Sequence, residues 1–197
     1  RGVEKLRVYT PQERTGDAAL LWIHGGGFVV GDARQDQPFV ADIARETGMV
    51  VVSANYRLAP EHRFPAQLSD VVGAYRWLRA HAAWHGVNPA HIVVGGQSAG
   101  GTLAAALAQL VHDSAARGGR EDFLGQLLLS PKLDDRPSSD RSLDTPRALI
   151  WDNRTTRNTW RAYLGRVYGP KDTPPSYAVP ARRENLRGLP PTFLAAG

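Results

Sequence analysis

Apolar residues gather in short continuous runs along much of this 197-residue chain. The runs cover residues 18–23, 49–54, 91–94, 127–130 and 192–196, and a further strand-like segment covers residues 3–9. Most of these runs do not alternate with polar residues, which is typical of strands that are covered on both faces. The pattern therefore predicts a buried sheet that includes the last run, at residues 192–196.

Segments with helical periodicity separate these runs. Their apolar stripes are Phe39, Val40, Ile43 and Ala44; then Leu68, Val71, Val72, Tyr75 and Leu78; then Leu103, Ala106, Leu107, Leu110 and Val111. The first stripe stops at Gly48, the second starts after Pro65, and the third ends before Gly118. Strands that alternate with helices predict an α/β fold, with a mostly parallel sheet and helices on both faces.

Residues 131–190 differ from the rest of the chain. They are rich in proline, arginine, aspartate and serine, with one helix-like stretch at residues 151–164. We expect a crossover with a lid-like helical insertion, inside one domain that spans residues 1–197. The chain opens on Arg1 without a methionine and closes directly after a strand-like run. We therefore expect a partial domain that is truncated at both ends.

Composition excludes several classes of function. A hydrophobic share of 42% and a charged share of 22% are those of an ordinary globular protein. The net charge of +5 comes from scattered basic residues, whereas nucleic-acid binding needs them clustered. Without cysteine there is no disulfide, thiolate metal site or cysteine nucleophile. No run is long enough for a membrane span and no signal peptide opens the chain, so we expect a cytoplasmic protein.

Residues 93–101 carry the pattern Gly-x-Ser-x-Gly, with Ser98 between Gly96 and Gly100. An apolar run leads into the pattern and a helix-forming run leads out of it. This context is typical of a nucleophile elbow, a sharp strand-to-helix turn that exposes a serine hydroxyl above a sheet. The flanking glycines remove the Cβ atoms that would clash in so tight a turn. We therefore predict that Ser98 is a nucleophile.

Three glycines, Gly25, Gly26 and Gly27, follow a predicted strand and His24. A backbone without side chains can turn its amides inward. Acyl transfer builds negative charge on a carbonyl oxygen, which backbone N–H groups can stabilise. We predict an oxyanion hole made by amides of this glycine loop (residues 25–27) and of Ala99. The alternative is a glycine-rich turn that serves only packing.

Neither glycine segment matches a phosphate-binding loop. Gly101 stands where the pattern Gly-x-x-x-x-Gly-Lys-Thr requires a lysine, so the charge that holds the β and γ phosphates is missing. Val30 stands at the last glycine position of Gly-x-Gly-x-x-Gly. We therefore expect no nucleotide and no other cofactor.

A third motif, Tyr-Arg-Leu-Ala-Pro-Glu at residues 56–61, lies between the other two. With His-Gly-Gly-Gly-Phe before it and Gly-x-Ser-Ala-Gly-Gly after it, the chain resembles the hormone-sensitive-lipase-like family of α/β-hydrolases. The resemblance runs from about residue 5 to residue 197 and is least distinct over residues 131–190. It implies an α/β-hydrolase fold and hydrolysis of short to medium acyl esters.

The resemblance also implies a role for the third motif, as a structural buttress beside the glycine loop. We expect Tyr56, Arg57 and Glu61 to support the site, and Arg57 can pair with Glu61 or with Asp70. His24 precedes the serine, so we expect its ring to anchor the glycine loop rather than to act as the base.

One residue inside the elbow departs from the family pattern. Gln97 stands before the serine, where the family usually has aspartate. We expect this side chain to support neighbouring loops and to have a modest effect on acidity or local stability.

A serine nucleophile needs a histidine that takes its proton and an acid that orients this histidine. In this fold their order is serine, acid, histidine. Of six histidines only His112 follows Ser98, and it lies roughly 21 Å along the same predicted helix. We therefore expect the acid and the base beyond residue 197. Asp134 or Asp135 is the alternative acid.

The remaining histidines predict no metal site. His81, His85 and His91 cluster before the nucleophile strand, where we expect a helix end and its loop, and no acidic residue shares their spacing.

The whole pattern predicts a serine esterase or lipase that acts on a small-molecule ester through an acyl-enzyme. The resemblance implies that an N-terminal cap and a C-terminal strand and helix are missing, so we expect the chain to be inactive alone. The alternative is a non-catalytic, ligand-binding or receptor-like member of the same fold.

Overall fold

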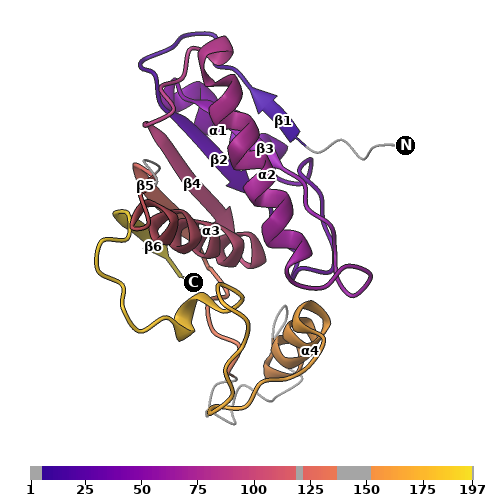
Figure 1. Ribbon diagram of the computed structural model, residues 1–197. Coiled ribbons are helices and arrows are strands. Elements are labelled where there is room, and N and C mark those ends of the chain that lie inside the picture. The colour runs from indigo at the N-terminus through magenta and orange to yellow at the C-terminus, as the bar shows by residue number, and fades with distance from the viewer. Residues whose placement is uncertain (1–5, 119–121, 137–151, 197) are drawn as a thin grey trace.

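The structure is a computed structural model that describes residues 6–118, 122–136 and 152–196. Within these ranges, six strands form one sheet. Their spatial order is β1-β3-β2-β4-β5-β6 (Figure 1). The bounds are Leu6–Tyr9 for β1, Ala19–Ile23 for β2, Val50–Ala54 for β3, Ile92–Gln97 for β4, Gly125–Leu129 for β5 and Thr192–Ala195 for β6. β1 is antiparallel to β3 and every other neighbouring pair is parallel, which confirms the predicted sheet.

Helices follow the predicted stripes. Their bounds are Gln37–Thr47 for α1, Ala66–His81 for α2, Ala99–Ala115 for α3 and Asn153–Leu164 for α4, with short 3-10 helices η1 at Ala82–His85 and η3 at Pro180–Arg182. Local signals fix several ends. Gly48 closes α1 in the left-handed conformation at φ 65°, which costs glycine little. Asp152 opens α4, because its carboxylate accepts the amide proton of Thr155.

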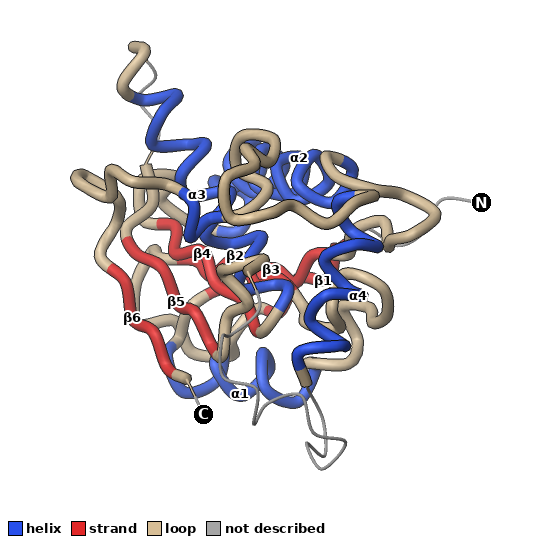
Figure 2. Tube along the Cα trace, turned by 90° about the horizontal axis from the view of Figure 1, so that it is seen from below, coloured by secondary structure: helices blue, strands red, loops and turns tan. Residues whose placement is uncertain are grey.

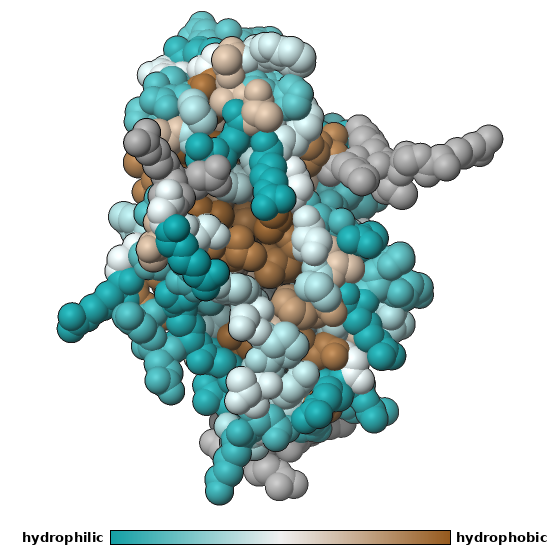
Figure 3. Space-filling model, viewed as in Figure 1, coloured by the Kyte–Doolittle hydropathy of each residue, from teal (hydrophilic) through white to brown (hydrophobic). Residues whose placement is uncertain are grey.

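Helices cover both faces of the sheet, as predicted. α2 and α3 pack on one face, where Leu21 and Val52 belong to the larger core cluster. α1 packs on the other face, where Trp22 and Val51 lie with Val40. Figure 2 shows the sheet between these two layers. On the face that carries α2 and α3, hydrophobic residues gather in the middle and hydrophilic residues surround them (Figure 3).

β4 is longer than its apolar run. The sequence predicts an end at Val94, but the strand continues to Gln97 and pairs Gly95 and Gly96 with β5. A Cβ added to Gly95 would lie 3.0 Å from the carbonyl oxygen of Leu127. The strand can continue through these glycines because the neighbouring strand holds them closely, and this support is invisible in the periodicity.

The prediction that the last run is buried was wrong. All four residues of β6 are exposed, Phe193 by 64% and Leu194 by 49%. β6 pairs with β5 on one side and with no described strand on the other. Its apolar composition resembles that of the inner strands, but its place at the sheet edge leaves its side chains open to solvent.

Both predicted catalytic motifs lie at the same edge of the sheet. β2 leads into the glycine loop and β4 leads into Ser98, so both lie where parallel strands have their carboxyl ends. In open α/β sheets, ligands bind outside that edge. α4 lies beyond the same edge (Figure 1).

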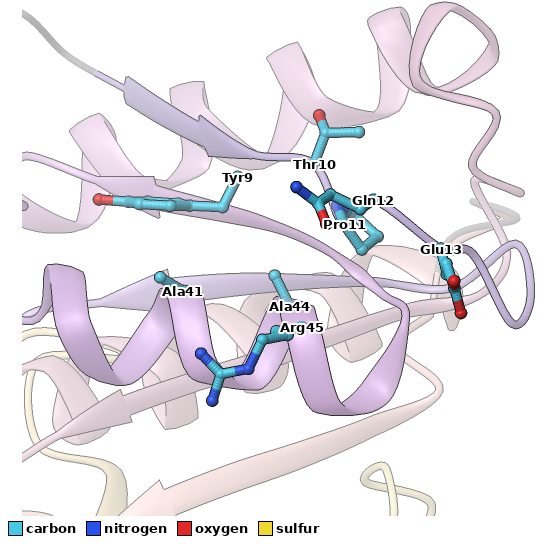
Figure 4. Close-up of a pocket in the computed structure, with 8 residues that line it drawn as sticks. All are labelled: Tyr9, Thr10, Pro11, Gln12, Glu13, Ala41, Ala44 and Arg45. Carbon is cyan, nitrogen blue, oxygen red and sulfur yellow. The ribbon is translucent and has the colours of Figure 1, made fainter.

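A groove lies at the opposite end of the sheet. Residues 9–13 line it together with Ala41, Ala44 and Arg45 of α1 (Figure 4). Tyr9 pairs with Val51, near the start of β3. The groove is therefore at the amino ends of the parallel strands and apart from Ser98.

None of the helices in the described ranges is both long and apolar enough to cross a membrane.

Candidate active site

Ser98 occupies a strained turn between β4 and α3. Its φ of 53° and ψ of −118° lie outside the regions that non-glycine residues prefer, and such strain costs about 1–3 kcal/mol. Three backbone hydrogen bonds hold the turn. The Ser98 amide donates to Leu129 at 2.9 Å, and its carbonyl accepts from Thr102 at 3.1 Å and from Lys132 at 3.2 Å. The surrounding structure thus holds the serine in the geometry of a nucleophile elbow.

The flanking glycines are required by close approach of the backbone. A Cβ added to Gly96 would lie 2.5 Å from the Gly100 carbonyl oxygen. One added to Gly100 would lie 2.0 Å from the carbonyl oxygen of Ile23, at the end of β2. Side chains at these positions would therefore push the elbow away from the strand that leads into the glycine loop.

The glycine loop lies directly against the elbow. A Cβ added to Gly25 would lie 3.5 Å from the Cβ of Ser98 and 3.1 Å from the carbonyl oxygen of Gln97. Gly26 and Gly27 have φ values of 113° and 61°. On the other side of the serine, the Ala99 amide is in the first turn of α3, where amides have no intrahelical acceptor. The two predicted sources of oxyanion donors thus flank one serine.

His24 is fully buried beneath the glycine loop. Its Nδ1 lies 2.7 Å from the Gly25 carbonyl oxygen, and its ring stacks on that of Tyr56 at a centroid distance of 4.3 Å. Burial lowers the pKa of His24, although the hydrogen bond to Gly25 acts in the opposite direction. Its Nε2 finds no hydrogen-bond partner among the described residues, so His24 does not hydrogen-bond Ser98.

Tyr56 and Arg57 connect the third motif to its surroundings. The Tyr56 hydroxyl donates to the His24 carbonyl at 3.0 Å, and burial raises its pKa. Arg57 binds Asp70 through Nε at 2.9 Å and through a terminal nitrogen at 3.0 Å. Of the two partners that the sequence leaves open, the structure places Arg57 against Asp70, and Glu61 is exposed.

The other histidines lie away from the elbow or have different partners. His81 ends α2 with its Nδ1 2.8 Å from the Trp77 carbonyl oxygen, and His91 pairs with Asp17 at 2.7 Å. His112 is in α3, as predicted. Within the described ranges no cluster of histidine and acidic residues can hold a metal ion.

The two aspartates that offered an alternative acid are engaged elsewhere. Asp134 pairs with Arg136, and the buried Asp135 pairs with Arg182, each at 2.7 Å. Neither hydrogen-bonds a histidine in the described part of the chain, so the alternative gains no support from geometry.

Sequence reasoning missed the contact between α4 and the glycine loop. Phe28, which follows the loop directly, stacks on Tyr163 of α4 at a centroid distance of 4.0 Å. Trp160 packs against Phe28 at 5.4 Å. Each of these aromatic residues is visible in the sequence, but 135 positions separate Phe28 from Tyr163 and no local pattern pairs them.

The sequence profile of the alpha/beta hydrolase fold matches residues 20–197. Esterase LipI of Mycobacterium tuberculosis is 36% identical over an alignment of 195 residues that covers 96% of this chain and 58% of that protein. Arylacetamide deacetylase of Oryctolagus cuniculus is 44% identical over an alignment of 117 residues that covers 55% of this chain and 29% of that protein.

A solved structure titled Bacterial Heroin Esterase matches the fold with a TM-score of 0.83 and 40% identity. The match covers 96% of this chain and 59% of that one. The chain thus spans less than two thirds of the length of each of these three proteins.

Proposed function

The chain belongs to the α/β-hydrolase family, in its hormone-sensitive-lipase-like branch, and we propose that the whole protein is a serine carboxylic ester hydrolase. One observation carries the proposal: a strained serine at a strand-to-helix turn has a glycine loop packed against it. Relatives named as esterases support hydrolysis of an ester. A small-molecule ester with a short to medium acyl chain is the proposed substrate.

The reaction begins at the Ser98 hydroxyl. Its oxygen bonds to the ester carbonyl carbon while a base removes its proton, and the carbonyl electron pair moves onto the oxygen. Amides of the glycine loop and of Ala99 stabilise this oxyanion. The carbonyl re-forms, the alcohol leaves with the proton, and an acyl-enzyme remains. Water then releases the acid and restores the serine.

We propose a histidine as the base of this reaction. None of the histidines in the described part of residues 1–197 hydrogen-bonds Ser98. His24 hydrogen-bonds its own loop, and His112 lies several turns along α3. We therefore propose that the 197-residue chain alone has almost no esterase activity. Loss of a triad in a serine hydrolase lowers kcat by about 10⁶-fold.

Several residues support the site without reacting in this proposal. His24 and Tyr56 hold the glycine loop from beneath, and Arg57 with Asp70 ties the segment after β3 to α2.

Gln97 is exposed beside the serine, where its side chain can contact a neighbouring loop. α4, within the crossover at residues 131–190, forms a lid-like wall beyond the carboxyl ends of the strands.

A non-catalytic, receptor-like function is the weaker candidate. A protein that only binds an ester has no need of a serine in a strained backbone or of glycines at the positions of oxyanion donors. Both features are present here, and the relatives described above are named for hydrolysis.

The test is hydrolysis of p-nitrophenyl butyrate by the full natural chain and by its Ser98→Ala variant. We expect turnover by the wild type and a loss of about 10⁶-fold in the variant. Turnover that survives the substitution would contradict the proposal, and ester binding without any turnover would favour the receptor-like function.

A further inference from the structure

Lys132 follows β5 and lies directly against the nucleophile elbow. Its amide donates to the Ser98 carbonyl at 3.2 Å. Its own carbonyl accepts from the Thr102 hydroxyl of α3 at 2.5 Å. The backbone of this lysine therefore belongs to the same hydrogen-bonded turn that holds the serine.

The side chain of Lys132 leaves that turn and reaches α4. Its Nζ lies 2.5 Å from Oγ1 of Thr159, a residue that is only 7% exposed. The Thr159 hydroxyl can donate to the Thr155 carbonyl at 2.9 Å, so its oxygen remains able to accept from the amine. Lys132 is partly buried, and this burial lowers its pKa to about 7.

The same turns of α4 hold the other half of the site. Trp160 and Tyr163 pack on Phe28, the residue after the glycine loop, and the Tyr163 carbonyl accepts the amide of Phe64 at 2.8 Å. α4 therefore bridges the segment behind the serine and the segment that carries the proposed oxyanion donors.

We propose that Lys132 is a positioning residue, which ties α4 to the nucleophile elbow through Thr159 and thereby keeps the glycine loop in register with Ser98. This inference rests on the proposed esterase function. Displacement of reacting groups by about 1 Å can cost 10²-fold in rate, so a tether outside the reacting atoms can still change turnover.

The test compares variants in the full natural chain at one fixed pH. Lys132→Met removes the amine and keeps an apolar stem. Thr159→Val removes the acceptor with little change of shape, and Thr159→Ser is the conservative control that keeps the hydroxyl. Lys171→Met is the matched control for loss of a lysine, because Lys171 is exposed.

We expect Lys132→Met and Thr159→Val each to lower kcat roughly threefold to tenfold, the effect of one lost hydrogen bond, with KM little changed. Thr159→Ser and Lys171→Met keep the wild-type kcat. The double variant is no slower than Lys132→Met, because that substitution already removes the contact with Thr159. The proposal would be overturned if the effects of Lys132→Met and Thr159→Val on kcat multiplied in the double variant. It would also be overturned if kcat were unchanged in these variants, or if Thr159→Ser were as slow as Thr159→Val.

Hydrogen exchange of the α4 amides separates this proposal from the proposed function. We expect faster exchange across Asn153–Leu164 in Lys132→Met and Thr159→Val, and wild-type exchange in Thr159→Ser. Unchanged exchange in both would overturn the tether even if the protein is an esterase. If Ser98-dependent turnover is absent, the esterase proposal fails, and exchange alone decides whether Lys132 holds α4.

Discussion

At the level of single residues, the elbow depends on a backbone approach between Gly100 and the end of β2 that leaves no room for a side chain. Gly100 packs its Cα against the end of β2, and Ser98 keeps a positive φ in the same turn. The glycine pattern in the sequence predicts this turn, because only a residue without Cβ fits such an approach. The identity of the opposing atom, the Ile23 carbonyl oxygen, comes only from the fold.

Gly100→Ala should lower the free energy of unfolding by about 3 kcal/mol or more, because its Cβ would lie 2.0 Å from backbone that cannot move freely. Urea unfolding followed by circular dichroism measures the change. The matched control is Gly73→Ala in α2, where no atom outside the adjoining helix backbone and the two neighbouring residues lies within 4 Å of the added Cβ. That variant should be more stable than the wild type by about 0.5–1 kcal/mol, the helix preference for alanine. Equal effects at the two positions would contradict the steric account.

The ionisation of Lys132 should make stability depend on pH. Burial lowers its pKa to about 7, whereas an unfolded lysine keeps a pKa of about 10.4. Between these values the unfolded chain binds more protons than the folded protein, so the free energy of unfolding rises with pH. The rise from this group is at most about 1.4 kcal/mol per pH unit. Lys132→Met should flatten the rise and Lys171→Met should keep it, as measured by urea unfolding from pH 7 to pH 10. An equal slope in Lys132→Met would contradict the lowered pKa.

At the level of elements, aromatic side chains of α4 pack against the segment that follows the glycine loop. Tyr163 is fully buried and stacked on Phe28, yet its hydroxyl has no hydrogen-bond partner among the described residues. Its ring therefore contributes through buried area and its hydroxyl does not.

Two substitutions of Tyr163 separate these contributions. Tyr163→Phe should leave the free energy of unfolding unchanged or raise it slightly, because a buried hydroxyl without a partner is removed. Tyr163→Ala should lower it by about 3–5 kcal/mol, as other large-to-small aromatic substitutions do. Thermal or urea unfolding distinguishes the two. A Tyr163→Phe variant destabilised by more than about 1 kcal/mol would show that the hydroxyl has a partner.

Elements with strong local signals were predictable, and those decided by neighbours were not. The limits of α1 and α2 follow from Gly48 and Pro65, which act through backbone conformation alone. The extension of β4 through Gly96 depends on β5, and the docking of α4 depends on an aromatic residue far away in the sequence. The motifs predicted a serine flanked by two glycines, with the glycine loop and Ala99 as sources of oxyanion donors. They did not predict Lys132, because a single lysine after a strand carries no signal of its own.

At the scale of the whole molecule, the sheet brings the three motifs to one edge and leaves β6 open at its side. Phe193 is 64% exposed on that outer strand. An exposed apolar edge strand is a template for association with further strands.

Phe193→Lys should therefore reduce self-association of the 197-residue chain and leave the free energy of unfolding within about 0.5 kcal/mol of the wild type. Sedimentation at several concentrations tests this, and unchanged association would show that the β6 edge is not the contact surface.

We expect Ser98 to form the covalent bond with the substrate. Mass spectrometry of peptides, after reaction of the full natural chain with a fluorophosphonate, tests it directly, because this reagent phosphonylates an activated serine and the adduct persists. We predict one adduct on the peptide that carries Ser98, and none in the Ser98→Ala variant. An adduct on another residue, or hydrolysis of p-nitrophenyl butyrate by a protein whose Ser98 stays unlabelled, would contradict the account.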